Sequence, residues 1–325
     1  MGVFSPTPYF DSLIDDFGIW QHTDGAVILR EEGYALDDAA RGLLLTLSFG
    51  RTNQSEVLWS YIIKSQTQTG LLGFARSDRH FIPAFASNDA NGETIWAAGY
   101  ALSKGFHKKE AAHLLTELIR CLDKMDYMRG YAYALLGAIY INDSIAKSCY
   151  VKLQVFFSGI DIDGDWPWPD SVLTYGSGIL PYAFLRYALV CSDKKAEVFG
   201  RKLLIFLERC CTAGRQRGPI GNDGWLRKGS GVAATYSQQP IDTSYMAWAW
   251  LAAYQLSGDA SDKGNGEAWM RWYEGDNVAS ARMYDPKSLS CFDGIDDIGV
   301  NYHSGAESNI CFLLSKYMLG EGKTI

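Results

Sequence analysis

Residues 91–123, NGETIWAAGYALSKGFHKKEAAHLLTELIRCLD, contain two apolar helical patterns joined by a short polar link. The second pattern places Leu114, Leu115, Leu118 and Ile119 at the three- and four-residue spacing of one helix face. Only SKGFHKK separates the two patterns, so the second helix must turn back along the first. This stretch therefore predicts a helical hairpin.

Paired helical patterns of this kind recur along the whole chain. Short links separate the two helices of a pair, whereas longer loops rich in aromatic, Asp and Gly residues separate the pairs. Helices are predicted over 37–49, 54–66, 91–104, 108–123, 128–141, 144–158, 174–191, 194–212, 239–257, 263–275 and 305–318, with residues 7–17 as a twelfth; the long loops are 18–36, 67–90, 159–173, 213–238 and 276–304. Repeated hairpins predict an all-α ring whose long loops share one end, where a functional site would be built.

The composition is that of a globular protein rather than of a nucleic-acid-binding one. The 325 residues are 47% hydrophobic and 21% charged, which is enough for a large core in one or two domains. The net charge is −7, and no long run of Lys and Arg offers a stripe for phosphates. We therefore expect no nucleic-acid partner.

The cysteines and the first residues bear on the cellular compartment. The seven cysteines are odd in number and lack metal-ligand spacing, which indicates buried thiols in a reducing compartment. The first residues lack a basic segment followed by a long apolar run, and no uninterrupted run of about 18 apolar residues occurs. These features predict a cytoplasmic protein without a membrane span.

Large aromatic residues are concentrated in the predicted long loops. Trp20, Trp166, Trp168 and Trp225 all lie there, together with tyrosines, histidines and many carboxylates. Flat rings stack on the C–H faces of sugars while carboxylates and amides bind hydroxyls. The alternative is that the aromatic side chains close the end of the ring. A single Trp favours that closing role, whereas the whole set favours a sugar site.

Five stretches in chain order carry a resemblance to a known family. The chain resembles the six-hairpin, glycosidase-like domains that accompany bacterial and archaeal glycosyltransferases. The resemblance implies one (α/α)6 toroid domain over residues 1–325, a carbohydrate substrate and a glycosyltransferase partner. The stretches are EEGYALDDAARGLLL at 31–45, SNDANGETIWAAG at 87–99, WPWPDSVLTYGSGILPYAFL at 166–185, DGWLRKG at 223–229 with SQQPIDTSYM at 237–246, and CFDGIDDIGVNYHSGAESN at 291–309.

Several positions differ from the pattern of that family. Ala39 stands where the family has Asn after its paired Asp, Asp170 stands for its Glu, and Gly176 stands for its Asp. In the second stretch the family's acidic, His and Arg positions are occupied by Asn88, Asn91 and Glu93. These differences shorten or remove several polar groups.

The pair Asp37 and Asp38 opens the first long helical pattern. An Asp before an Ala/Leu run is usually an N-cap, and one Asp is enough for that role. The pair is therefore explained by two capping residues or by one cap and one carboxylate that points into the ring mouth.

Asp170 follows the run Trp166-Pro167-Trp168-Pro169. Prolines fix the backbone and tryptophans exclude water, which would raise the pKa of a nearby carboxyl as a general acid requires. The alternative role is an N-cap for the residues after Ser171. Because two Trp and two Pro exceed what capping needs, we interpret the tryptophans as a sugar platform and Asp170 as the acid.

Two further loop–helix junctions carry polar residues. Pro240 marks a helix start, and Asp242 in its first turn would be stabilised by the helix dipole alone, but the amides of Gln238 and Gln239 favour hydroxyl binding. Glu307 is also a first-turn acid, and it follows Asn301 and His303 closely. Both junctions are candidates for the site.

The loop from Asp293 to Asp297 is rich in Asp but lacks the spacing of a calcium-binding loop, so no metal is predicted. Nucleophile-elbow, zinc-protease and nucleotide-binding motifs are absent from the sequence, and we expect no cofactor.

These residues are predicted to converge on one cavity of a carbohydrate-active enzyme, most simply a glycoside hydrolase acting on an oligosaccharide or glycoconjugate with inversion. Asp170 is the expected acid, and Asp38, Asp242 or Glu307 the base. The expected substrate-binding residues are Tyr34, Asp37, Trp166, Trp168, Tyr175, Trp225, Gln238, Gln239, Asp293, Asn301 and His303. Two alternatives stay open: a sugar epimerase or isomerase that uses histidines among His22, His80 and His303, and a non-catalytic glycan-binding module.

Overall fold

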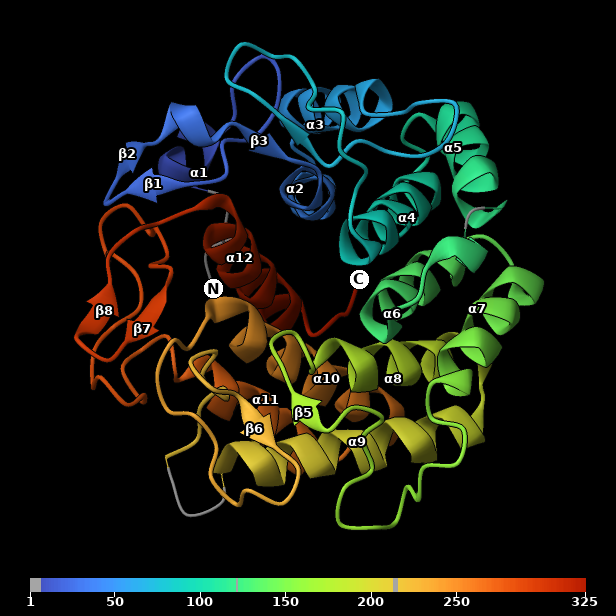
Figure 1. Cartoon of the computed structure of the whole chain (residues 1–325), viewed down its shortest axis with the longest axis vertical. Coiled ribbons are helices and arrows are strands. Elements are labelled where there is room, and N and C mark those ends of the chain that lie inside the picture. Colours follow the sequence, from blue (N-terminus) through green and yellow to red (C-terminus); the bar gives the residue numbers. More distant parts are fainter. Residues whose placement is uncertain (1–6, 121, 213–215) are drawn as a thin grey trace.

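The computed structural model describes residues 7–120, 122–212 and 216–325, and this part of the chain forms a closed ring of helices (Figure 1). Each inner helix contacts the next, and the last contacts the first. The inner helices are α2 (Leu36–Ser48), α4 (Asn88–Ser103), α6 (Met128–Ala138), α8 (Ile179–Cys191), α10 (Pro240–Ser257) and α12 (Ala306–Glu321). The outer helices are α1 (Pro8–Ser12), α3 (Thr52–Lys64), α5 (Lys108–Arg120), α7 (Asp143–Val155), α9 (Lys194–Thr212) and α11 (Ala260–Met270). The predicted all-α toroid is confirmed.

Apolar patterning explains which helices lie inside the ring. Every residue of α10 from Pro240 to Ala253 is buried, as expected for a helix surrounded by protein. The outer helix α5 buries only Ala111, Leu114, Leu115 and Leu118, which form one stripe facing α4. The 91–123 stretch is therefore the predicted hairpin of an inner and an outer helix.

Glycines allow the inner helices α4 and α6 to approach closely. A Cβ added to Gly137 would lie 2.2 Å from the carbonyl oxygen of Ile95, and one added to Gly99 would lie 2.3 Å from that of Gly137. Real Cβ atoms do not approach backbone oxygens so closely, so a larger residue would force the helices apart.

We therefore expect Gly137→Ala to lower the free energy of unfolding by about 1–3 kcal/mol through overpacking. Gly320→Ala in α12 is the matched control, because an added Cβ there meets nothing within 4 Å. The control should be stabilising by about 0.5–1 kcal/mol, since alanine favours helix over glycine. Urea unfolding of both variants tests this, and a Gly137→Ala protein as stable as the parent would refute the close packing.

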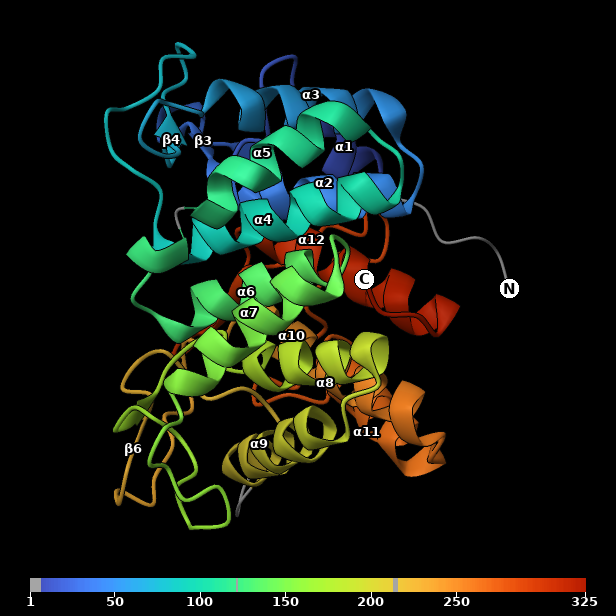
Figure 2. The ribbon, with the colours of Figure 1, turned by 90° about the vertical axis from the view of Figure 1, so that its right-hand side faces the viewer.

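The inner helices begin at the end of the ring that carries the long loops, as Figure 2 shows with β3, β4 and β6 on one side. Short turns such as residues 49–51 and 192–193 lie at the other end. There Ile325 is buried and its carbonyl accepts a hydrogen bond from the Tyr182 hydroxyl at 2.6 Å.

Short antiparallel strand pairs fasten the long loops to one another. β1 (Thr23–Asp24) pairs with β2 (Val27–Ile28), β3 (Tyr34–Ala35) with β4 (Phe74–Ala75), β5 (Val172–Leu173) with β6 (Leu226–Arg227), and β7 (Gly294–Asp296) with β8 (Gly299–Asn301). Single 3-10 turns occur at η1 (Arg30–Glu32) and η2 (Leu122–Lys124). The β3–β4 and β5–β6 pairs each join two different loops, whereas β1–β2 and β7–β8 are each formed within one loop.

Most helix boundaries agree with the sequence prediction, and the clearest difference is at α8. The predicted start at residue 174 is wrong: the helix begins at Ile179, because Gly176 has a φ of 69° and the chain turns before Gly178. Asp170 therefore does not cap this helix. The twelfth predicted helix, 7–17, is shorter than expected, because α1 ends at Ser12.

The cysteines that the structure describes are Cys149, Cys191, Cys210, Cys211, Cys291 and Cys311, and no disulfide bond joins any two of them. The seventh, Cys121, lies outside the described residues. Within the described ranges no helix combines the length and the apolar character needed to cross a membrane.

Candidate functional site

A cavity of about 900 Å³ opens at the long-loop end of the ring, beside the first turns of α2 and α12. Its wall is mainly polar and comes from four of the loops as well as from these two helices. The lining residues are Gln21, His22, Thr23, Leu29, Glu32, Ala35, Asp37, Asp38, Arg41, Phe74, Asn222, Ser237, Gln238, Gln239, Asp293, Gly294, Asp296, Asn301, His303, Gly305, Glu307 and Ser308. A volume of this size suits a small-molecule ligand.

Arg41 is the centre of the ionic contacts in this cavity. Its guanidinium lies 2.5 Å from Glu307 Oε2 and 3.1 Å from Asp37 Oδ2. It also lies 3.6 Å from Asp38 Oδ1 and 3.3 Å from Glu93 Oε1. One buried cation is thus shared by carboxylates from α2, α4 and α12, which fixes the relative positions of Asp37, Asp38 and Glu307 in the cavity wall.

Burial disfavours the charged form of two carboxyls in this cluster, Asp38 and Glu93. Burial, and next the neighbouring Asp37, raise the pKa of the Asp38 carboxyl well above its usual range, although Arg41 acts against this. Burial likewise raises the pKa of Glu93. Burial opposes the charge of Arg41, but Glu93, Glu307, Asp37 and Asp38 together raise the pKa of the guanidinium. Asp38 Oδ1 and Glu93 Oε2 have no hydrogen-bond partner among the described residues. Asp38 is therefore a carboxyl that favours its protonated form.

A second group of titratable residues lines the same cavity. Asp293 accepts hydrogen bonds from the Gly305 N–H at 2.8 Å and the Ser308 hydroxyl at 2.7 Å, which anchors the start of α12. Burial raises the pKa of Asp293, while His22 and His303 act in the opposite direction. Both histidines are thus within electrostatic reach of one carboxyl, whereas His80 is exposed and does not line the cavity.

The side-chain amides of Gln238, Gln239 and Asn301 in the cavity wall form hydrogen bonds with other protein groups. Gln238 is fully buried, accepts a hydrogen bond from Trp272 Nε1 at 2.8 Å and donates to the Thr235 carbonyl. Gln239 Oε1 accepts a hydrogen bond from Asn222 Nδ2, and Asn301 Oδ1 accepts one from the His303 N–H. These bonds orient the loops more than they offer free groups to a ligand.

Asp242 lies near the ring mouth but is not part of the cavity wall. One oxygen accepts the Gly176 N–H at 2.6 Å, and the other has no hydrogen-bond partner among the described residues. Burial raises the pKa of this carboxyl to about 7, although the Gly176 bond acts against it. Asp242 therefore holds the turn before α8 against α10.

The raised pKa of Asp242 predicts a pH-dependent stability difference from Asp242→Asn. In the unfolded chain the Asp242 carboxyl has its usual pKa of 3.8 and loses its proton near pH 4. In the folded protein the same carboxyl keeps its proton up to about pH 7. Relative to the variant, the parent should therefore lose stability as pH rises from about 4 to about 7, by roughly 1 kcal/mol per pH unit. Asparagine keeps the acceptor for Gly176. Urea unfolding across this range tests the shift, and a difference independent of pH would contradict it.

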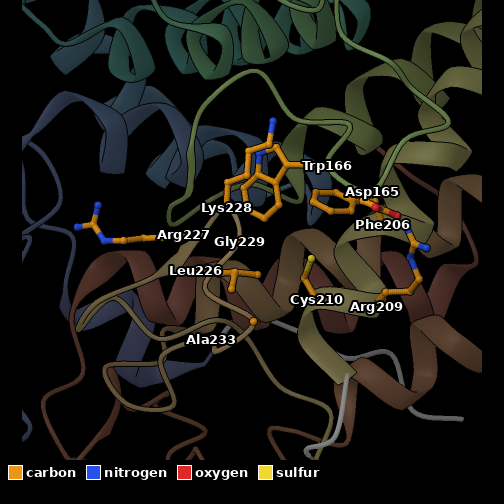
Figure 3. A pocket seen from close by; sticks show the side chains of 11 residues that line it. Asp165, Trp166, Phe206, Arg209, Cys210, Leu226, Arg227, Lys228, Gly229 and Ala233 are labelled. Carbon is orange, nitrogen blue, oxygen red and sulfur yellow. The ribbon is translucent and has the colours of Figure 1, made fainter.

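The expected platform of Trp166 and Trp168 does not form in the acidic cavity. Trp168 is only 2% exposed and packs against Phe157 and Phe206 in the core, so it is closed to a ligand. Trp166 lines a separate cavity of about 560 Å³, shown in Figure 3. Asp170 lines neither cavity, and its Oδ2 accepts a hydrogen bond from the Tyr127 hydroxyl at 3.3 Å.

Three further predicted binding residues also lie outside the acidic cavity wall. Tyr34 is buried, stacks on Trp20 and donates its hydroxyl to Asp15 Oδ2. Tyr175 lies under the Arg129 guanidinium at 4.5 Å, and Trp225 Nε1 donates to Asn222 Oδ1. Their aromatic rings support the loops, as the alternative interpretation of the single tryptophans expected.

The structure brings together Asp37, Asp38, Gln238, Gln239, Asp293, Asn301, His303 and Glu307 from the predicted set. The sequence interpretation missed Arg41 as the centre of the cluster and Glu93 as its partner. A signal for Arg41 was present, because an Arg inside the apolar segment 36–48 follows Asp37 and Asp38 at the four- and three-residue spacing of an ion pair. Among the described residues, no group of three or more His, Cys, Asp or Glu could hold a metal ion.

Comparisons with known proteins identify similar folds but no close relative. No family model matches this chain, and no curated protein sequence does. A sugar epimerase from a ruminal bacterium matches with a TM-score of 0.71 at 12% identity, over 98% of this chain and 96% of that chain. A D-mannose isomerase matches with a TM-score of 0.73 at 11% identity, over 96% and 94%. A GH76 α-mannanase of Bacteroides thetaiotaomicron matches with a TM-score of 0.60 at 8% identity, over 97% and 92%. The chain therefore has the (α/α)6 toroid fold that these enzymes share.

Proposed function

We propose that the chain is a carbohydrate-active enzyme that hydrolyses a glycosidic bond in the acidic cavity. The observation that carries this proposal is the pairing of Asp38 with Glu307 in one cavity wall, in different environments. Asp38 is buried and favours its protonated form, whereas Glu307 is one-third exposed and held by Arg41. One proton donor and one carboxylate are the two groups that glycoside hydrolysis requires.

In this mechanism Asp38 gives its proton to the leaving glycosidic oxygen as the bond from that oxygen to the anomeric carbon breaks. Water attacks the anomeric carbon, and Glu307 accepts the proton that the water loses. Exchange with solvent returns Asp38 to its protonated form and Glu307 to its ionised form. Arg41 keeps the carboxylates in place and positions the Glu307 carboxylate in the cavity wall. The proposed outcome is inversion, which requires about 6.5–9.5 Å between the two carboxyl groups so that water fits between Glu307 and the sugar.

The fold comparisons support a carbohydrate substrate without selecting the reaction. The similar structures include a glycosidase as well as a sugar epimerase and a sugar isomerase. A fold hosts many activities, so the reaction has to be argued from the site. We also propose that residues 1–325 act as one domain, since the ring closes only when α12 packs against α2. A cytoplasmic location and a glycosyltransferase partner stay predictions from the sequence.

Epimerisation of a sugar is the second candidate, and a specific observation favours it. His22 and His303 line the same cavity as Asp38, and both act on the pKa of Asp293. A pair of histidines can remove a proton from one face of a sugar carbon and return it to the other face. Two of the similar structures are a sugar epimerase and a D-mannose isomerase.

Two assays separate the candidates. Oligosaccharides incubated with the protein should yield new reducing ends, and proton NMR of the first product should show inversion at the anomeric carbon. Reducing sugars incubated in D₂O should gain no deuterium at C2. Deuterium at C2 without cleavage of any glycoside would replace hydrolysis by epimerisation, and an absence of both reactions would leave only a binding role.

A further inference from the structure

The Trp166 cavity is a second concave site that the proposed hydrolysis does not use. It lies between the loop that precedes α8, the end of α9 and the segment that follows β6 (Figure 3). Its floor is apolar, with Phe206, Cys210, Leu226 and Ala233 beside Trp166. Its volume of about 560 Å³ is within the range of small-molecule sites.

Trp166 is held in place before any ligand arrives. Its Nε1–H donates to the Asp170 carbonyl at 2.8 Å, and its ring meets Phe206 edge-on with centroids 5.4 Å apart. Pro167 and Pro169, which both follow Trp166, restrict the backbone of the loop. A fixed aromatic side chain in a cavity wall binds a flat apolar group at little cost in side-chain entropy.

Three cations line this cavity: Arg209, Arg227 and Lys228. Arg209 and Lys228 lie at different ends of the lining side chains, whereas Arg227 extends away from them (Figure 3). Within the described residues, the side chains of Arg209 and Lys228 form no hydrogen bond or ion pair.

Three other cations on or near α9 are paired with acids. Arg201 bonds Asp262 at 2.8 Å, Lys202 lies 2.6 Å from Asp163, and Arg217 lies 2.7 Å from Glu208. Among the described lining residues, Asp165 is the one acid beside three cations, which leaves an excess of positive charge in a protein whose net charge is −7. The charge of this cavity is therefore opposite to that of the acidic cavity.

We propose that the Trp166 cavity binds a small amphiphilic anion, with an apolar ring system against Trp166 and Phe206 and an anionic group beside Lys228 or Arg209. A neutral apolar ligand would leave both cations unused, and a small inorganic anion would leave the apolar floor exposed to water. A ring is favoured over a flexible chain, because aromatic pairs gain energy beyond the area that they bury.

The test compares matched probes on the full chain. 1-Naphthyl phosphate should bind at one site per molecule, at least 10-fold more tightly than neutral 1-naphthol and more tightly than octyl phosphate. Calorimetry gives the affinities and the stoichiometry. Equal binding of naphthol and naphthyl phosphate would overturn the anionic part of the proposal. Tighter binding of octyl phosphate than of naphthyl phosphate would overturn the preference for a ring over an alkyl chain.

Variants locate the site. Arg209→Gln with Lys228→Gln should weaken naphthyl phosphate at least 10-fold and leave naphthol unchanged, whereas Trp166→Ala should weaken both. Arg76→Gln is the control, because Arg76 is an exposed cation outside this cavity. Thermal melting of each variant checks that the fold persists. Binding that survives all three substitutions at Trp166, Arg209 and Lys228 would overturn the proposal even if sugar hydrolysis is confirmed.

Discussion

Asp38→Asn is expected to lower turnover of a natural glycan by about 10²–10⁴-fold, the usual contribution of a positioned acid. Asparagine has nearly the same shape as aspartate and carries no charge. Because burial already disfavours the charged form of Asp38, substrate binding and the fold should persist. The loss should be much smaller for an aryl glycoside with a good leaving group, because its oxygen needs little protonation. Initial rates on both substrates measure the difference.

Two further variants make this prediction specific. Glu307→Gln should lower the rates of both substrates to the same degree, because it removes the base rather than the acid. Asp297→Asn, an exposed change of the same charge outside the cavity wall, should leave both rates unchanged. A large loss in Asp170→Asn together with normal turnover in Asp38→Asn would move the acid to the residue that the sequence favoured.

Arg41→Met is expected to lower the free energy of unfolding at neutral pH by about 3–5 kcal/mol, the cost of breaking a buried ion pair. Methionine fills a similar space but leaves the carboxylates of Asp37, Asp38, Glu93 and Glu307 without their shared cation. Loss of this cation should raise the pKa values of Asp38 and Glu93 further above their usual range, because Arg41 lowers both in the parent protein. The destabilisation should therefore shrink as the pH falls and these carboxyls become protonated in both states.

Urea unfolding of Arg41→Met at several pH values measures this effect. Arg120→Met is the control, because Arg120 pairs with Glu117 on the exposed side of α5 and such pairs contribute about 0–1 kcal/mol. A loss for Arg41→Met no larger than that of the control would show that Arg41 does not hold the cluster together.

The helical framework was predictable from the sequence because each helix carries its own signal. The apolar runs of α4 and α10, the stripe of α5 and the short turns between paired helices are local features. The predicted start of α8 failed, because the positive φ of Gly176 depends on the contact of this turn with Asp242, which lies 66 residues away in the chain.

The candidate site was predictable only where its residues follow from helix direction. All inner helices begin at the loop end, and α12 packs against α2, so the first-turn acids Asp38 and Glu307 of these two neighbouring helices lie in one cavity wall. The direction in which a loop side chain points depends instead on long-range packing. Trp168 was expected to bind sugar but fills the core, and Trp166, two residues earlier, lines a different cavity. Sequence spacing cannot distinguish these outcomes.

A crystal structure of the Asp38→Asn protein with an uncleaved oligosaccharide would test the central claim most directly. The proposal predicts the sugar in the 900 Å³ cavity, with the glycosidic oxygen beside residue 38 and Glu307 on the opposite side of the anomeric carbon. The Glu307 carboxyl should lie about 6.5–9.5 Å from the side-chain amide of residue 38. A sugar bound in the Trp166 cavity, with the acidic cavity left empty, would contradict the proposal.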